Sequence, residues 1–333
     1  MISKSNMSAG ARKLVQTCAK VKANERVLVV TDTGRSPRIG QEIYRASLDA
    51  GAEGVIMIME PGAYPGAEVP QAVAEAMKAS DVIFGITTSS LYHTQARLEA
   101  CRAGARLVAA TEITEEIMVS GGIEADFEAQ VPLVEELTRK MSQAHDIRLT
   151  TQGGTDLRGK TGGRSALKFT GLAHAKGDAV GVPTIEAAIA PLEGTCEGVL
   201  VVDGSGTYLG LIRNPIRITV EKGRALTITG GEKAGTLTGL LEKQSDPNCW
   251  NIGEIGIGLN PCCRLTGNII EDEGKLGTCH VALGNNVTLG GANRAKVHID
   301  LVMWKPTLYL DGKAVFSAEP IERVGPENLE GHR

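Results

Sequence analysis

Ionisable side chains that could do chemistry stand singly inside apolar, glycine-framed segments near the end of the chain. These segments read NIGEIGIGLNP, GTCHVALG and KVHIDLVM, and they contain Glu254, His280, His298 and Asp300. A carboxylate or imidazole is costly to bury unless it is paired, hydrogen-bonded or bound to a metal. We therefore expect the four side chains to share a partner, and a pair of metal ions would serve all of them.

His298 and Asp300 stand at positions i and i+2 of a strand pattern, with Ile299 between them, so their side chains point to the same face of a sheet. An imidazole nitrogen beside a carboxylate oxygen suits Zn, Mn, Co or Fe. The same pattern also fits an ordinary strand pair in which the histidine is hydrogen-bonded to its neighbour.

Glu254 and Glu186 favour the metal interpretation. Glu254 has no local partner in IGEIGIG, although an ion pair with a distant arginine is an alternative, and Glu186 lies in the apolar run VPTIEAAIAP. With His280 and the His-x-Asp pair, the set has three carboxylates and two imidazoles. Its charge nearly neutralises two divalent ions, and a carboxylate can bridge ions about 3.5–4 Å apart.

Other polar residues are weaker candidates. Arg158 and Arg164, in GGTDLRGKTGGRSA, could bind a substrate carboxylate or belong to a solvated turn. His174, in LAHAKGD, could enter the cleft as an acid or base, and surface exposure fits it equally well. The acidic turn 271–273 is expected to be solvated.

The elements that must position these residues fall into two predicted domains, 1–145 and 146–333. In the first, the strand-like runs RVLVVT, GVIMIM, DVIFGIT and RLVAAT alternate with amphipathic helices. This predicts an α/β domain with about four parallel strands and covering helices. The polar helix 124–143 is the predicted linker.

The second domain is predicted to be mostly antiparallel β. Short strand patterns such as DIRLTT, EGVLVVDG and IRITVEKGRALTITGG alternate with Gly, Asn and Asp turns, and 232–245 is the one predicted helix. The turns in VEKGRA and YLDGKA, each between two strand patterns, predict two hairpins.

Composition excludes several classes of protein. The 333 residues are 42% hydrophobic and 22% charged, with a net charge of -4, which argues against nucleic-acid binding. No signal peptide or membrane-spanning run is visible, and the seven irregularly spaced cysteines do not form a CxxC pair. We expect a cytoplasmic protein without a membrane partner.

Four segments also carry a family resemblance. PTIEAAIAPLEGTCEGVLVVDG, NIGEIGIGLNP, EDEGKLGTCHVALG and HIDLVMWKPTLYLDGK resemble, in this order, the blocks of the M29 (aminopeptidase T/AmpS-like) metallopeptidases. The likeness covers most of 184–313. It implies a commonly dimeric, exopeptidase-like hydrolase with an N-terminal α/β domain and a β-rich metal domain. The implied ligands of its two metal ions are Glu186, Glu254, His280, His298 and Asp300.

One position departs from this family. The peptidases carry a catalytic tyrosine shortly after the metal-binding histidine, and here the corresponding residue is Val287, with no tyrosine near it in the sequence. Because that phenol would stabilise a developing oxyanion, the departure weakens the case for a peptidase.

The 2,5-dihydroxypyridine dioxygenases resemble the same blocks. They imply a single Fe(II) held by two histidines and one carboxylate, with histidine at position 254 and without ligands at 186 and 280. The present chain has glutamate at 254, although His280, His298 and Asp300 could still form such a triad.

The sequence thus favours a two-metal hydrolase, with Zn, Co, Mn or Mg and with Glu254 as bridging ligand or general base, acting on a short peptide or other amide, possibly cyclic. Two alternatives stay open. One is an Fe(II) dioxygenase that cleaves a hydroxylated N-heteroaromatic ring, and the other is a degenerate family member that only binds a metal or ligand. We also expect a homodimer.

Overall fold

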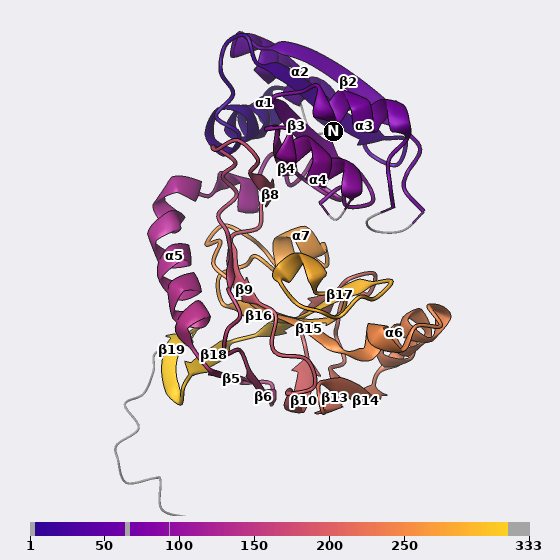
Figure 1. Cartoon of the computed structure of the whole chain (residues 1–333), viewed down its shortest axis with the longest axis vertical. Helices are drawn as coiled ribbons and strands as arrows, with labels where there is room; N and C mark the ends of the chain where they lie inside the picture. The colour runs from indigo at the N-terminus through magenta and orange to yellow at the C-terminus, as the bar shows by residue number, and fades with distance from the viewer. Residues whose placement is uncertain (1–3, 64–66, 93, 319–333) are drawn as a thin grey trace, which may run out of the picture.

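The computed structural model describes residues 4–63, 67–92 and 94–318. One parallel sheet, covered by helices, occupies one end of the molecule, and two antiparallel sheets form the rest (Figure 1). The predicted α/β plus antiparallel β architecture is confirmed.

The parallel sheet is built from βα units, as predicted. Its strands, in spatial order, are β2 (Glu53–Met59), β1 (Arg26–Asp32), β3 (Val82–Ile86), β4 (Arg106–Ala109) and β8 (Ala179–Gly181). The helices of this region are α1 (Lys4–Arg12), which continues into the π-helical turn η1 (Lys13–Cys18), α2 (Pro37–Asp49), α3 (Gln71–Lys78) and α4 (Gln95–Arg102). Alternate residues of β1 join two different apolar clusters, so both faces of the sheet are buried.

The fifth strand, β8, comes from beyond the predicted domain boundary. After α5 (Phe127–Gln143) the chain enters the β region and then returns to place β8 beside β4. The division at residue 145 therefore does not separate the sheets completely. Helix α5 begins later than the predicted linker helix because the Asp126 side chain caps it, accepting a hydrogen bond from the Ala129 N–H.

The central antiparallel sheet lies nearest to the parallel one (Figure 1). Its strands, in spatial order, are β12 (Gly210–Leu211), β11 (Ser205–Gly206), β17 (His298–Trp304), β16 (Thr278–Gly284), β15 (Ile252–Gly258), β9 (Glu186–Ile189) and β7 (Leu167–Phe169). Every residue of β15, β16 and β9 is buried, which fits their near-continuous apolar sequences.

The outer antiparallel sheet completes the fold on the far side. It contains β14 (Arg224–Gly230), β13 (Ile216–Glu221), β10 (Glu197–Val202), β6 (Asp156–Lys160), β5 (Asp146–Thr151), β18 (Pro306–Leu310) and β19 (Lys313–Ser317). Both predicted hairpins, β13–β14 and β18–β19, are present. The helical segments of the β region are α6 (Glu232–Lys243), η3 (Pro247–Trp250), α7 (Ile269–Asp272) and η4 (Val287–Leu289), and η2 (Gly122–Glu124) precedes α5.

Within the described ranges, none of the helices combines the length and apolar character needed to cross a membrane. All seven cysteines are free thiols, and most are buried, as the irregular spacing predicted.

Candidate metal centre

The strand register of the central antiparallel sheet places the predicted ligands on one face. Glu254 in β15 is paired with Ala282 in β16, and Ala282 with Asp300 in β17. Directly paired residues in an antiparallel sheet share a face, as do residues two apart in one strand. His280 therefore joins Ala282, and His298 joins Asp300, on the face that carries Glu254.

Glu186 reaches the same face from β9, where it is paired with Gly258, four residues beyond Glu254. The missing side chain of Gly256 makes room for the His280 ring, which lies directly over it. A Cβ atom at Gly256 would come within 2.1 Å of Cε1 of His280. Gly256 thus provides the space that the His280 ring needs.

His298 has a ring orientation that suits a metal ligand. Its Nδ1 lies 2.7 Å from the Asn285 carbonyl oxygen, which can only accept, so Nδ1 carries the hydrogen. Its Nε2 then points at Glu254 Oε2, at 3.0 Å, and at Asp300 Oδ1, at 3.1 Å. Two carboxylate oxygens and an imidazole nitrogen therefore converge on a place that favours a cation.

Asp300 is itself oriented by Thr207, which follows β11. The Asp300 N–H donates to Thr207 Oγ1 at 3.0 Å, and the Thr207 N–H donates to the Asp300 carbonyl at 2.9 Å. The Thr207 hydroxyl also donates to Asp300 Oδ2 at 3.4 Å, and outer contacts of this kind help to fix the geometry of a ligating carboxylate.

His280 and Glu186 form the second half of the cluster. His280 Nε2 lies 3.6 Å from Glu254 Oε1 and 3.7 Å from Glu186 Oε2. The other nitrogen of His280, Nδ1, and Oε2 of Glu186 are buried without a hydrogen-bond partner. Buried polar atoms of this kind call for a ligand that the protein itself does not supply.

The electrostatics of the cluster point to the same conclusion. Burial raises the pKa of Glu186 to about 8. Burial acts in the same direction on Glu254, but hydrogen bonds from His280 and His298 outweigh it and hold the Glu254 pKa below its usual range. Burial would lower the pKa of His280, yet the Glu186 and Glu254 carboxylates raise it to about 10. The carboxylates therefore create a negative potential that favours a cation, and a metal ion bound here would replace the protons on the two histidines.

The five residues fit a metal as two overlapping groups that share Glu254. Within each group the possible ligand atoms lie within 4.8 Å of one another. One group is Glu186, Glu254 and His280, and the other is Glu254, His298 and Asp300. The predicted iron triad of His280, His298 and Asp300 is not among the groups that the described residues form. The structure instead brings His298 and Asp300 together with Glu254.

A cavity of about 210 Å³ lies over this cluster, between the central antiparallel sheet and the parallel sheet. Thr88 and Thr111 line it from the carboxyl ends of β3 and β4, where open α/β sheets bind their ligands. Thr88 is held by the buried Asp32 at the end of β1, to which its hydroxyl donates at 2.8 Å. We call these strand ends, together with the loops that follow them, the roof of the cavity. The face of the central sheet that carries the predicted ligands is the floor.

Tyr92 and Phe169 form an aromatic wall of the cavity. Their ring centroids are 6.3 Å apart with an interplanar angle of 52°. Arg97 lies over the Tyr92 ring, 4.8 Å from its centroid. Tyr208 also lines the cavity. Two tyrosines that are remote from Val287 in the sequence, Tyr92 and Tyr208, thus line the cavity.

The prediction that the acidic turn 271–273 is solvated is wrong. Glu271 and Asp272 are fully buried, and Glu273 lines the cavity. The Gly122 N–H donates to Oε1 of Glu271 at 2.8 Å, across 149 residues of sequence. Donors so distant leave no local signal in the sequence.

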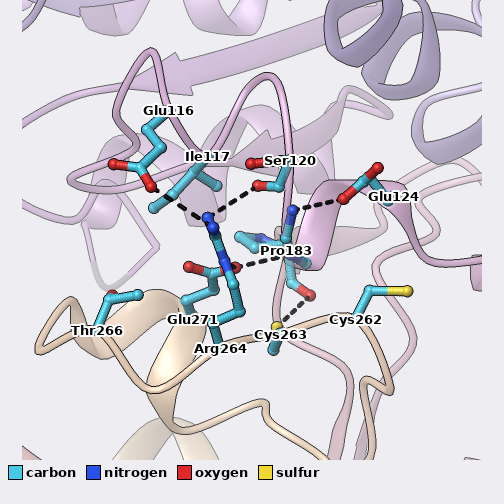
Figure 2. A network of polar contacts seen from close by, with 12 residues as sticks. Glu116, Ile117, Ser120, Glu124, Pro183, Cys262, Cys263, Arg264, Thr266 and Glu271 are labelled. Atoms are coloured by element: carbon cyan, nitrogen blue, oxygen red, sulfur yellow. Dashed lines mark hydrogen bonds and ion pairs between the residues drawn. The ribbon is translucent and has the colours of Figure 1, made fainter.

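Glu271 belongs to a latch between the two ends of the molecule, which we define as Glu271, Arg264 and the 116–122 loop (Figure 2). Arg264 donates to the Ser120 carbonyl at 3.4 Å and lies 3.8 Å from Glu271 and 3.5 Å from Glu116. The latch connects the loop after β4 to the segment that carries α7. It thereby fixes the roof relative to one side of the cavity.

Three predicted substrate contacts lie outside the cavity and have protein partners of their own. Arg158 is exposed on β6 beside Asp156, Arg164 pairs with Glu193, and His174 Nε2 contacts the Thr17 carbonyl at 2.8 Å. No arginine or lysine occurs among the described residues that line the cavity. The prediction that Arg158, Arg164 and His174 bind substrate is therefore corrected.

A family model for 2,5-dihydroxypyridine 5,6-dioxygenase (NicX) matches residues 7–321. The chain belongs to this family. A 2,5-dihydroxypyridine 5,6-dioxygenase from Pseudomonas putida KT2440 is 28% identical over 269 residues, which is 77% of this chain and 74% of the relative. Membership identifies the protein as an enzyme of the oxygenase class.

Two solved structures share the fold. The 2,5-dihydroxypyridine dioxygenase of Pseudomonas putida KT2440 aligns with a TM-score of 0.81 and 21% identity, over 96% of this chain and 98% of that one. AmpT from Thermus thermophilus aligns with a TM-score of 0.68 and 15% identity, over 95% and 98%.

These findings correct the sequence-based function. The chain resembles the aminopeptidases in fold, but the family match and the 28% identical relative are both dioxygenases, so the predicted M29 metallohydrolase is wrong. The ligand residues that suggested it are nevertheless present in one cluster. The dioxygenase family also implies a metal cofactor, in agreement with that cluster.

Proposed function

We propose that the protein is an Fe(II)-dependent dioxygenase that opens the ring of a small, hydroxylated N-heteroaromatic compound. The observation that carries this proposal is the match to the dioxygenase family along residues 7–321. The cavity supports it, because 210 Å³ is small compared with the roughly 300–1,000 Å³ of pockets for drug-sized ligands.

The residues that would hold the iron are Glu254, His298 and Asp300, one of the two groups that the structure brings within ligand distance. A ferrous ion, when bound, supplies the redox chemistry with O₂ that protein side chains lack. We also propose that the other group, Glu186 with Glu254 and His280, holds a second divalent ion. Metal analysis of a Glu186→Gln variant separates the groups, since the iron is expected to stay.

The chain's own residues would bind and orient the substrate. The aromatic wall of Tyr92 and Phe169 offers a surface against which a flat ring can pack. Hydroxyls of the roof, such as that of Thr111, can hydrogen-bond ring substituents, while Ile269 and Leu289 keep water out of one side.

Oxygen uptake tests the proposal. Protein purified without O₂ and loaded with Fe(II) is expected to consume O₂ and 2,5-dihydroxypyridine in equal amounts. His298→Ala should abolish the reaction. His174→Ala is the matched control, because that histidine lies outside the cavity and should leave the rate unchanged. Ring loss in the absence of O₂, or no uptake by iron-loaded protein with any hydroxylated pyridine, would overturn the proposal.

The homodimer and the cytoplasmic location remain parts of this proposal. Light scattering of the purified protein checks the first, and cell fractionation checks the second.

A further inference from the structure

Among the described residues that line the cavity, Glu273 is the one carboxylate that is neither a predicted metal ligand nor part of the roof. It directly follows α7, so the latch fixes the backbone that carries it. Its side chain contacts Thr184, whose Oγ1 lies 3.2 Å from Glu273 Oε1.

The hydrogen-bond geometry of Thr184 favours a proton on Glu273. A hydroxyl has a single hydrogen to donate. Thr184 Oγ1 lies 2.9 Å from the Ile270 carbonyl oxygen, which can only accept, and this shorter contact takes the hydrogen. The oxygens of Thr184 and Glu273 then face each other as two acceptors, unless Oε1 of Glu273 carries a hydrogen and donates it. The geometry therefore favours a neutral carboxylic acid.

The surroundings of Glu273 act in the same direction. Burial, together with the facing carboxylates of Glu186, Asp300 and Glu254, raises the pKa of Glu273 well above its usual value, and His280 offsets only part of this. The hydrogen-bond geometry supports the neutral form independently of these charges.

A neutral Glu273 presents an uncharged acceptor to the cavity. With the hydrogen on Oε1 directed to Thr184, the other oxygen, Oε2, is carbonyl-like, and no group in the described part of the chain donates to it. A 2-hydroxylated N-heteroaromatic ring takes up the cyclic-amide form, in which the ring nitrogen carries a hydrogen. Such an N–H is the complement of Oε2.

We propose that Glu273, as a neutral acid, recognises the substrate by accepting a hydrogen bond from the ring N–H of an uncharged cyclic amide. This inference rests on the proposed function and names the part of the substrate that is read. It also explains the lack of cationic residues in the described cavity lining, because a ring without a carboxylate needs none.

Ligand binding without turnover tests the inference. The iron-loaded protein is titrated anaerobically, by calorimetry, with 2-pyridone and with N-methyl-2-pyridone, which lacks the N–H. Wild type is expected to prefer 2-pyridone by about tenfold, the effect of one hydrogen bond. Glu273→Gln keeps a neutral side chain with an acceptor and should retain the preference. Glu273→Met, of similar size without the acceptor, should lose it, with iron content and circular dichroism unchanged.

Each outcome separates the role of Glu273 from the proposed function. An unchanged preference in Glu273→Met overturns the role of Glu273 alone, and a loss in Glu273→Gln equal to that in Glu273→Met shows that the charged form is needed. If wild type binds neither probe, the substrate class fails and this inference with it.

An infrared measurement reports on the proton without any substrate. The difference spectrum of wild type against Glu273→Gln at neutral pH should contain the carbonyl stretch of a protonated carboxyl group. Its absence would contradict the neutral acid.

Discussion

The floor and the roof of the cavity are built in opposite ways. The floor is a set of ligands on neighbouring strands of one sheet, where the register of Glu254, Ala282 and Asp300 fixes which side chains meet. The roof consists of strand ends and loops of the parallel sheet, where Thr88 and Tyr92 are held by side-chain contacts with Asp32 and Arg97.

This difference suggests that the floor serves metal binding and the roof serves substrate selection. Residues of a paired strand cannot shift singly without breaking the ladder, so the floor suits ligands that must keep one geometry. Loops that follow strands vary without disturbing the sheet, so the roof suits contacts that choose a substrate. A change in the floor should therefore remove metal and activity together, whereas a change in the roof should alter substrate binding alone.

Among changes that keep every metal ligand, the largest effect is expected from Gly256→Ala, which alters the floor. The added Cβ would lie 2.1 Å from the His280 ring and displace it. We expect metal affinity and turnover to fall by about 10- to 100-fold, the range for groups that orient a ligand. Metal titration and O₂ uptake measure the two quantities.

Gly239→Ala is the matched control, because a Cβ at that helical glycine meets nothing within 4 Å. It should leave both quantities unchanged and stabilise the fold by roughly 0.5–1 kcal/mol. Full metal affinity in Gly256→Ala would show that the floor is less constrained than its register implies.

The latch should show a smaller effect, on stability rather than on metal. Glu271 is fully buried and accepts the Gly122 N–H, so Glu271→Ala should lower the free energy of unfolding by about 1–3 kcal/mol. Glu116 faces the same Arg264 from an exposed position, and Glu116→Ala should cost less than about 1 kcal/mol. Urea denaturation compares the two. Equal losses would mean that Arg264, rather than the buried carboxylate, holds the roof to the side of the cavity.

The smallest effect is expected from the roof. Tyr92→Ala removes one ring of the aromatic wall and should raise KM by about 2- to 12-fold, corresponding to roughly 0.5–1.5 kcal/mol. Tyr92→Phe keeps the ring and should stay close to wild type, and metal content should be normal in both variants. Loss of metal in Tyr92→Ala would erase the distinction between roof and floor.

The ligands of the floor could be predicted from the sequence, whereas the residues of the roof could not. Each floor ligand stands alone in an apolar strand, which is a local signal, and the structure brings all five together. Glu273, Tyr92 and Thr88 carry no such signal, because their surroundings come from remote segments. The α/β units and hairpins were predictable from periodicity, whereas the return of β8 to the parallel sheet depends on tertiary packing.

The function was harder to predict than the site. Three carboxylates and two imidazoles suit several metals and more than one reaction, and the resemblance to the M29 peptidases tipped the prediction toward a hydrolase. The family match corrected the reaction while the ligand cluster stayed the same. Ligand chemistry therefore located the centre, and the walls of the cavity carry the information about its substrate.

The most direct test of the central claim is iron-edge anomalous diffraction from crystals grown anaerobically with Fe(II). We expect an iron peak within coordination distance of Glu254, His298 and Asp300, facing the cavity. Fully iron-loaded protein with no peak at this group, or with its iron bound elsewhere in the molecule, would contradict the account.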